Sequence, residues 1–135
     1  MAATQAKAQE CSVRPVQKLF QYEGQTQIIL DVEAAMARAQ AINGVIPQEA
    51  AQDITAKAQV ALVPQGEFDA AYDIVGHRMV ALLTVWRDSL GDAGDQYVHY
   101  GATTVDIYGT TTILQIDRSL QALDTCMAKT IDTMA

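Results

Sequence analysis

The segment ILQIDRSLQALDTCMAKTIDTM, residues 113–134, decides the fold class of this chain. Its large apolar residues recur at steps of three and four, which is the spacing of one face of an α-helix. These residues are Ile113, Ile116, Leu120, Leu123, Met127, Ile131 and Met134. A stripe of this length resembles a coiled-coil seam, and it requires partner helices to cover it. The sequence therefore predicts an all-α protein with one long helix that packs in a bundle.

Further helical patterns lie upstream of this seam. The first covers residues 16–43 and is expected to break or bend near Gly24. The second covers roughly residues 47–62, with Pro47 in its first turn. The third covers residues 68–90, and the polar segment 91–95 is predicted to be a loop. The chain is accordingly divided into a loose leader, an N-terminal helical domain and the start of the long helix: residues 1–15, 16–102 and 103–135.

The segment Tyr97-Val98-His99-Tyr100-Gly101-Ala102-Thr103-Thr104-Val105-Asp106 stands directly ahead of the long helical pattern. Unpaired N–H groups at a helix start attract anions, and neighbouring hydroxyl and imidazole groups complete a receptor for a carboxylate or a phosphate. A purely structural interpretation is also open, in which Thr103 or Thr104 caps the helix and Asp106 complements its first turn. The spacing alone favours the cap.

Composition narrows the range of functions. The 135 residues contain 9 Lys and Arg against 16 Asp and Glu, for a net charge of −7, which argues against binding to nucleic acid or to an anionic membrane. The apolar stretch at residues 79–86 is too short to span a bilayer, so a cytoplasmic protein is expected. Cys11 and Cys126 have no metal-ligand spacing and are expected to be free thiols. No glycine-rich phosphate loop is present in the sequence.

Three segments resemble the fumarase/aspartase superfamily, and they occur in the expected order. Residues 97–106 resemble its first signature, in which a Thr-Ser-x-Asp core follows a His-aromatic-Gly lead. Residues 20–47, with LDVEAA at 30–35 and GVIP at 44–47, are similar to an earlier segment, and GHRMVALL at 76–83 is similar to the first histidine segment. Within the superfamily, the chain is most similar to adenylosuccinate lyases and 3-carboxy-cis,cis-muconate cycloisomerases.

The resemblance implies a fold, a reaction and a set of site residues. The fold is the N-terminal helical domain of the fumarase-like fold, running into the first long helix of a central bundle that forms between subunits of a homo-oligomer, expected to be a tetramer. The reaction is a trans β-elimination that releases fumarate from an N-substituted succinate, without a metal or an organic cofactor. His77 is the expected catalytic residue, and the expected substrate-binding residues are His99, Tyr100, Thr103 and Thr104.

The sequence also departs from the family pattern. Thr104 replaces a common serine and keeps its hydroxyl, whereas Val105 and Gly109 replace residues that are usually polar. The family's second signature and its serine-rich mobile loop have no match, so the general acid and base are expected beyond Ala135. The chain is therefore interpreted as the N-terminal part of a longer lyase, inactive by itself. Two alternatives remain: a cycloisomerase, and a non-catalytic helical association module.

Overall fold

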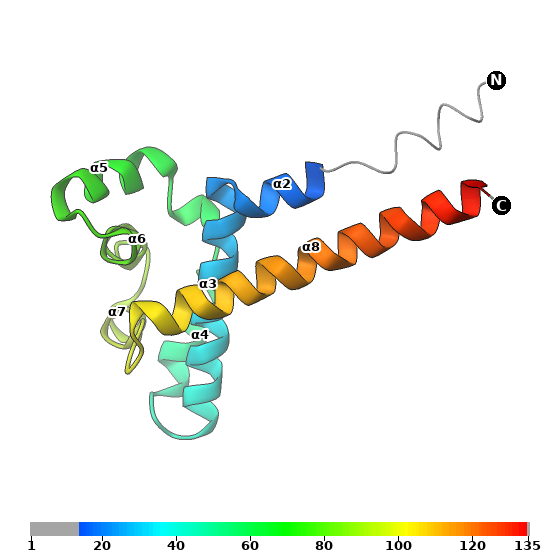
Figure 1. Ribbon diagram of the computed structural model, residues 1–135. Coiled ribbons are helices and arrows are strands. Elements are labelled where there is room, and N and C mark those ends of the chain that lie inside the picture. The colour runs from blue at the N-terminus through cyan, green and yellow to red at the C-terminus, as the bar shows by residue number, and fades with distance from the viewer. Residues whose placement is uncertain (1–13, 135) are drawn as a thin grey trace.

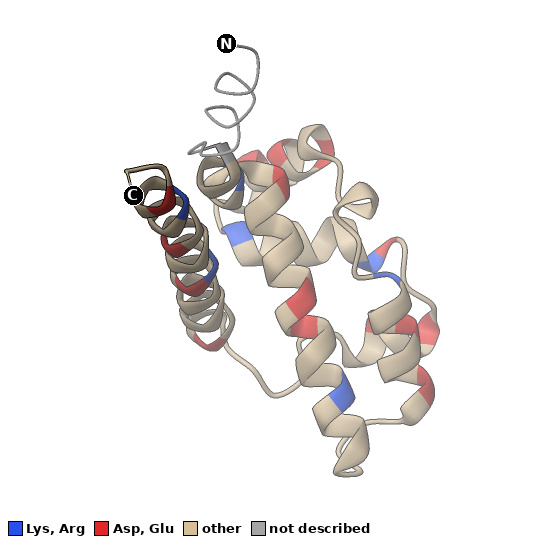
Figure 2. Cartoon of the chain, turned by 90° about the vertical axis from the view of Figure 1, so that its right-hand side faces the viewer, with Lys and Arg blue, Asp and Glu red and all other residues tan. Residues whose placement is uncertain are grey.

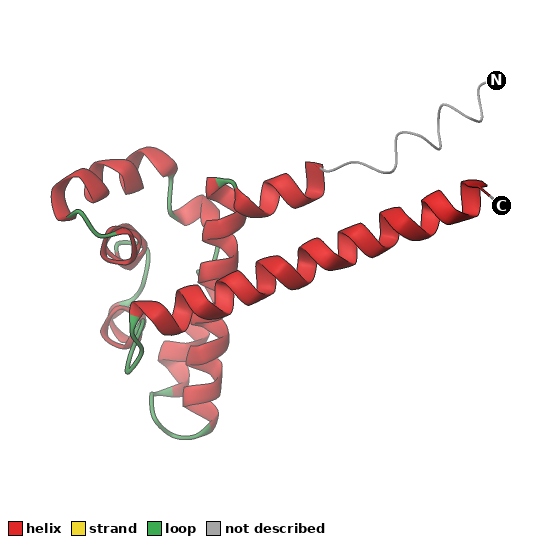
Figure 3. Cartoon of the chain, in the orientation of Figure 1, coloured by secondary structure: helices red, strands yellow, loops and turns green. Residues whose placement is uncertain are grey.

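The computed structural model describes residues 14–134, and every regular element within this range is a helix (Figures 1 and 3). In chain order the elements are α2 (Arg14–Phe20), α3 (Tyr22–Ile42), α4 (Gln48–Ala56), the 3₁₀ turn η1 (Val60–Leu62), α5 (Gln65–Val75), α6 (Arg78–Arg87), α7 (Asp92–Tyr97) and α8 (Thr104–Met134). The all-α prediction is confirmed. Within these residues, no helix is both long and apolar enough to cross a membrane. Acidic residues are scattered over most helices, and basic residues are few (Figure 2).

Helix α3 is the centre of the fold, since α2, α4 and α8 all pack against it. Its apolar residues Ile28, Ile29 and Leu30 are at most 4% exposed. Steps of four and three residues continue this buried face through Ala34 and Ala37, where small side chains allow neighbouring helices to approach closely. The helix therefore serves as the platform on which the rest of the described chain is assembled.

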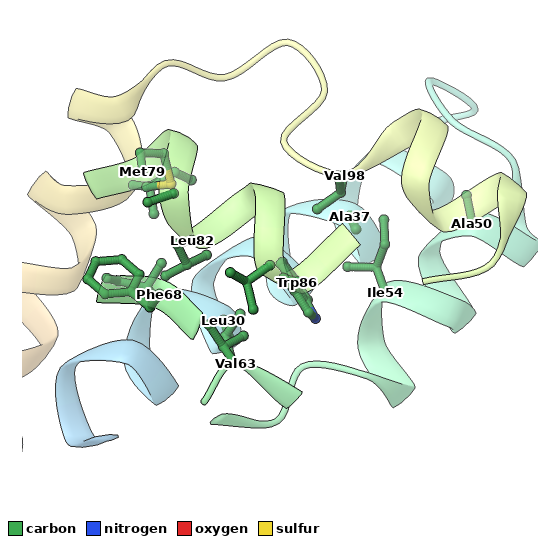
Figure 4. Packing of buried hydrophobic residues seen from close by; sticks show 14 of the residues in the cluster. Leu30, Ala37, Ala50, Ile54, Val63, Phe68, Met79, Leu82, Trp86 and Val98 are labelled. Carbon is green, nitrogen blue, oxygen red and sulfur yellow. The ribbon is translucent and has the colours of Figure 1, made fainter. Parts of the chain in front are cut away.

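The hydrophobic core lies between α3, α4 and α6, and Trp86 is its largest member (Figure 4). The indole is completely buried, and its Nε1–H donates a 2.8 Å hydrogen bond to the carbonyl of Lys57, so its one polar atom is satisfied. Leu30, Ile54 and Leu82 lie in the same cluster. This packing fixes α6 against the α3–α4 pair.

The break in the first helical pattern lies at Gln21, between α2 and α3 and three residues ahead of Gly24, near which the sequence predicts a break or bend. Gly24 has another role, because a Cβ atom at this position would overlap the backbone carbonyl of Lys18. The absence of a side chain at Gly24 thus allows α2 to fold back closely on the first turn of α3. The helix α2 begins at Arg14, so residues 14 and 15 do not belong to a leader, and residues 1–13 lie outside the described range.

Further helix boundaries differ from the prediction, since the pattern over residues 47–62 contains α4, which ends at Ala56, and the separate turn η1. The pattern over residues 68–90 is two helices, because Gly76 adopts the left-handed conformation (φ 65°) that ends α5, and the extended His77 starts α6. The predicted loop at 91–95 is wrong, since α7 occupies Asp92–Tyr97. The Gly91 N–H ahead of α7 donates a 2.7 Å hydrogen bond to Asp53 Oδ2 on α4. Tertiary contacts therefore stabilise a short helix that the local sequence does not favour.

The long helix α8 crosses α3 and extends past the other described helices (Figure 1). Its first residue is Thr104. Only its first part is packed, through Ile107, Thr111 and Gln115. The seven apolar residues of the predicted seam, from Ile113 to Met134, are 48–82% exposed, and we call them the exposed stripe. The predicted free thiol at Cys126 is wrong, since this cysteine is disulfide-bonded, and Cys11 lies outside the described range.

Candidate functional site

The segment between α7 and α8 makes two sharp turns. Val98 ends α7 in an extended conformation and is buried in the core at 3% exposure. His99 follows with φ 61°, and Gly101 has φ 68°. A positive φ is costly for a residue with a side chain, by about 1–3 kcal/mol, so the surrounding structure must hold His99 in place. This loop is therefore a constrained element of the fold.

Two side chains from α3 provide this constraint. Glu33 and Gln40 are seven residues apart, which places them two turns apart on one face of the helix. The Glu33 Oε1 atom lies 2.5 Å from His99 Nδ1, and Gln40 Nε2 donates a 2.7 Å hydrogen bond to the Tyr100 carbonyl. The loop is thus connected to the platform helix through both the imidazole and the backbone.

The Glu33 carboxylate is completely enclosed, with a side-chain exposure of 0%, whereas the His99 side chain is 16% exposed. Burial raises the pKa of the Glu33 carboxyl, and the hydrogen bond and charge of His99 act in the opposite direction. The second carboxylate oxygen, Oε2, is buried and has no hydrogen-bond partner among the described residues. A half-satisfied buried carboxylate is costly, which makes Glu33 an unusual residue for a purely structural position.

The start of α8 is capped by Asp106. Its Oδ2 accepts a 3.0 Å hydrogen bond from the Thr103 N–H, as the side chain at the third helical position of a capping box does. Thr104 is the first helical residue and is half-buried, and Thr103 is exposed. Among the described hydrogen bonds, neither threonine hydroxyl is engaged in this cap. The cap interpretation is therefore correct for Asp106, while both hydroxyls remain available to a ligand.

His77 lies on a different element from the other predicted site residues. It precedes α6, where its Nδ1 accepts a 3.3 Å hydrogen bond from the Val80 N–H. The neighbouring Arg78 stacks over Phe68, with 5.3 Å between the guanidinium carbon and the ring centroid, and also interacts with Tyr108 of α8. The observed contact of the exposed His77 is that of a helix cap, whereas His99, Tyr100, Thr103 and Thr104 are brought together by one loop.

Sequence reasoning missed Glu33 and Gln40 as members of this site. The available signal was an acidic residue on the apolar face of α3, close to Leu30 and Ala37. A charged side chain at such a position is almost always paired. The pattern could not reveal the partner, because His99 lies 66 residues further along the chain.

A groove of about 370 Å³ lies beside the site, between α3 and α8, and Asp106 is part of its wall. Its lining is mostly apolar: Asp31, Val32, Ala35, Met36, Asp106, Ile107, Thr110 and Leu114. Within residues 14–134, no group of three or more His, Cys, Asp or Glu side chains is arranged to hold a metal ion. The hydroxyls and the imidazole of the neighbouring loop can donate hydrogen bonds to an anion, and the imidazole can exchange a proton.

The sequence is similar to the sequences of known enzymes. The chain is 32% identical to the adenylosuccinate lyase of Methanocaldococcus jannaschii over 81% of its own length and 24% of the relative's. It is 40% identical to the Synechocystis adenylosuccinate lyase over 70% of the chain and 21% of that enzyme. Against the 3-carboxy-cis,cis-muconate cycloisomerase of Pseudomonas aeruginosa, the identity is 32% over 90% of the chain and 27% of the relative. No protein-family model matches the sequence.

Solved structures of the same kind share the fold. The 3-carboxy-cis,cis-muconate lactonizing enzyme of Pseudomonas putida superposes with a TM-score of 0.76 at 28% identity, over 88% of this chain and 28% of that one. A fumarate lyase from Mesorhizobium sp. BNC1 has a TM-score of 0.67 at 38% identity, over 76% of this chain and 24% of that one. The chain belongs to the fumarase/aspartase superfamily. It spans about a quarter of the length of the curated relatives that it matches.

Proposed function

We propose that this chain is the N-terminal part of an adenylosuccinate lyase-like enzyme that eliminates fumarate from an N-substituted succinate. The observation that carries the proposal is the constrained loop of residues 97–104, whose sequence resembles the first superfamily signature. This loop presents an imidazole and two hydroxyls at the start of α8. The similarity to adenylosuccinate lyases supports this reaction in particular.

The chemistry of a β-elimination explains the need for such a loop. A base removes the proton next to a carboxylate, and negative charge then accumulates on that carboxylate as an aci-carboxylate. Fixed donors directed at the developing charge lower the barrier. We assign this role to the hydroxyls of Thr103 and Thr104, with His99 and Tyr100 completing the binding site. His77 is assigned to orient the substrate or the general base.

The remaining parts of the site are proposed to come from outside these 135 residues. The general acid and base belong to the whole enzyme, of which this chain matches about a quarter. We propose a homotetramer, in which the exposed stripe of α8 enters the central bundle and several subunits contribute to each site. The substrate is a small succinyl-type dicarboxylate and no cofactor takes part. The cytoplasmic location stays a prediction.

The test is fumarate release by the whole enzyme. Purified full-length protein is incubated with adenylosuccinate or argininosuccinate, and fumarate is followed by its ultraviolet absorbance. We expect turnover of adenylosuccinate by the whole enzyme and none by the 135-residue chain. Clear turnover by the short chain, abolished by His99→Gln, would contradict the placement of the general acid and base elsewhere.

A second candidate function is that of a 3-carboxy-cis,cis-muconate cycloisomerase. Its support is the similarity to the Pseudomonas aeruginosa enzyme over 90% of the chain, together with the TM-score of 0.76 to the lactonizing enzyme. The same whole-enzyme assay decides between the two candidates when 3-carboxy-cis,cis-muconate is offered beside adenylosuccinate. The third possibility, a non-catalytic association module, is supported by the exposed stripe alone, and it predicts that neither substrate is turned over.

A further inference from the structure

The buried pair Glu33–His99 connects the loop to a residue of α3 that can act on the site. Glu33 is one of four buried polar or charged residues among those described, and its side chain is fully enclosed. Its carboxylate contacts a residue that we place in the substrate site, across 66 positions of sequence. A buried carboxylate without a charged or hydrogen-bonded partner would be strongly destabilising, so the pair must form together as the chain folds.

The contact determines which ring nitrogen of His99 is available. A neutral imidazole carries its proton on either Nδ1 or Nε2, and the hydrogen bond made by one nitrogen selects the state of the other. A carboxylate 2.5 Å from Nδ1 selects the form in which Nδ1–H donates to Glu33 Oε1. The ring then keeps Nε2 for a substrate or for proton exchange, because the described contacts of the imidazole engage only Nδ1.

The backbone of the loop supports the same interpretation. His99 adopts a left-handed conformation that costs free energy for any residue with a side chain. A glycine would take this conformation without that cost, as Gly101 does two residues later. The imidazole is therefore kept at an unfavourable backbone position. Gln40 holds the following carbonyl from the same face of α3, so ring and backbone are both oriented by this helix.

We propose that Glu33 is the positioning residue of His99: its buried carboxylate holds the imidazole in the Nδ1–H form and directs Nε2 at the substrate. This role rests on the proposed lyase function, since it assigns His99 a substrate to contact. Glu33 itself touches neither the substrate nor the reacting atoms. Its effect on the reaction passes entirely through the ring of His99.

The first experiment measures the tautomer in the 135-residue chain. The chain has only two histidines, so the long-range ¹H–¹⁵N NMR spectrum contains two imidazole patterns, and His77→Gln assigns them. We expect His99 to show the Nδ1–H pattern in the parent and a mixed or Nε2–H pattern in Glu33→Gln. The Glu33→Asp variant should restore part of the parent pattern. A parent His99 that populates both tautomers equally would overturn the positioning role.

The second experiment separates positioning from a merely structural role by a double-mutant cycle in the whole enzyme. Glu33→Gln is expected to lower kcat/KM for adenylosuccinate about tenfold in the parent and to have little effect in a His99→Gln background, as coupled neighbours do. The exposed Glu67→Gln is the matched control and should leave both values unchanged. Equal losses in both backgrounds would overturn the positioning role alone. An enzyme inactive on all substrates offered would instead overturn the proposed function, and the positioning role with it.

Discussion

The two parts of α8 differ in which side chains they bury and which they leave exposed. In the first part, residues 104–115, the buried face consists of Ile107, Thr111 and Gln115, two of which are polar. In the second part, residues 116–134, six of the seven side chains of the exposed stripe are 48–82% exposed, and only Ile113 of the stripe belongs to the first part. Gln115 Nε2 donates a 2.7 Å hydrogen bond to the Leu19 carbonyl at the end of α2, so its burial is satisfied by a specific contact. The most apolar face of the helix is therefore not the face that packs within this chain.

This difference shows that one periodic pattern can serve two kinds of contact. Association through an exposed apolar stripe depends on area and is tolerant of sequence. Packing through Gln115 depends on a defined polar partner, the Leu19 carbonyl, and specifies one orientation. The start of α8 also carries the candidate site, which needs a fixed orientation relative to Glu33 and Gln40. The specific packing thus lies where the site requires precision.

The largest expected effect is on association through the second part of α8. Leu120 and Leu123 are 54% and 48% exposed, and each fully buried apolar side chain contributes roughly 1.5–3 kcal/mol. Leu120→Asp with Leu123→Asp should remove roughly 6 kcal/mol or more from a pair of copies. Light scattering should show dimers or larger species for the parent chain and monomers for the double variant. A parent chain that is monomeric at high concentration, with α8 still helical, would contradict the assignment of the exposed stripe to association.

The next effect is on stability through the first part of α8. Ile107 is 2% exposed, so Ile107→Ala should lower the free energy of unfolding by about 2–5 kcal/mol. Leu120→Ala is the matched control in the same helix, and it should change the unfolding free energy of the monomer by less than about 0.5 kcal/mol. Urea denaturation, monitored by circular dichroism at a concentration where the chain is monomeric, measures both. Similar losses at the two positions would mean that the two parts do not differ in packing.

A third prediction concerns the first residue of α8 and catalysis by the whole enzyme. Thr104→Val keeps the shape of the side chain but removes the hydroxyl, and it should raise the barrier by roughly 2.7–4 kcal/mol, a hundredfold or more in kcat. Thr104→Ser keeps the hydroxyl and should stay active. Loss of a helix cap alone costs about 1 kcal/mol of stability and would leave turnover intact. If Thr104→Val turns over like the parent, the hydroxyl does not bind the carboxylate.

The smallest expected effect is the pH dependence of stability, and it has opposite signs at two carboxylates. Burial raises the pKa of Glu33, so between its ordinary value of 4.5 and the raised value the folded state binds more protons than the unfolded state. The contribution of Glu33 to stability therefore falls as the pH rises through this window. The Glu33→Gln variant should not show this decrease in stability. The free energy of unfolding, measured across this pH window, tests it.

Asp53 provides the matched comparison. Burial acts to raise its pKa, but the Lys57 side chain and the Gly91 N–H together hold the pKa below the ordinary value of 3.8. Its contribution to stability is present above that value and is lost as the pH falls through the lowered pKa. Asp53→Asn should therefore flatten the acid side of the stability profile. The same slope for both variants would contradict the assignment of opposite environments.

The sequence by itself determined the all-α class, the long helix that starts near residue 103, and the grouping of the predicted binding residues in one loop. These features are local, because helical periodicity and a cluster of residues 97–106 are visible within one or two turns of chain. The dipeptide Asn43-Gly44 is a further local stop signal, and α3 ends directly before it at Ile42. Gly76 was present as a signal as well, although its left-handed conformation was not predicted.

Only the tertiary structure decided the break at Gln21, the helix at Asp92–Tyr97 and the partner of His99. The helix α7 depends on Asp53 of α4, and the approach of α2 to α3 depends on the absence of a Cβ atom at Gly24. The Glu33–His99 contact joins residues 66 positions apart. No periodicity encodes such a pair, because burying the carboxylate costs free energy unless the assembled fold supplies its partner.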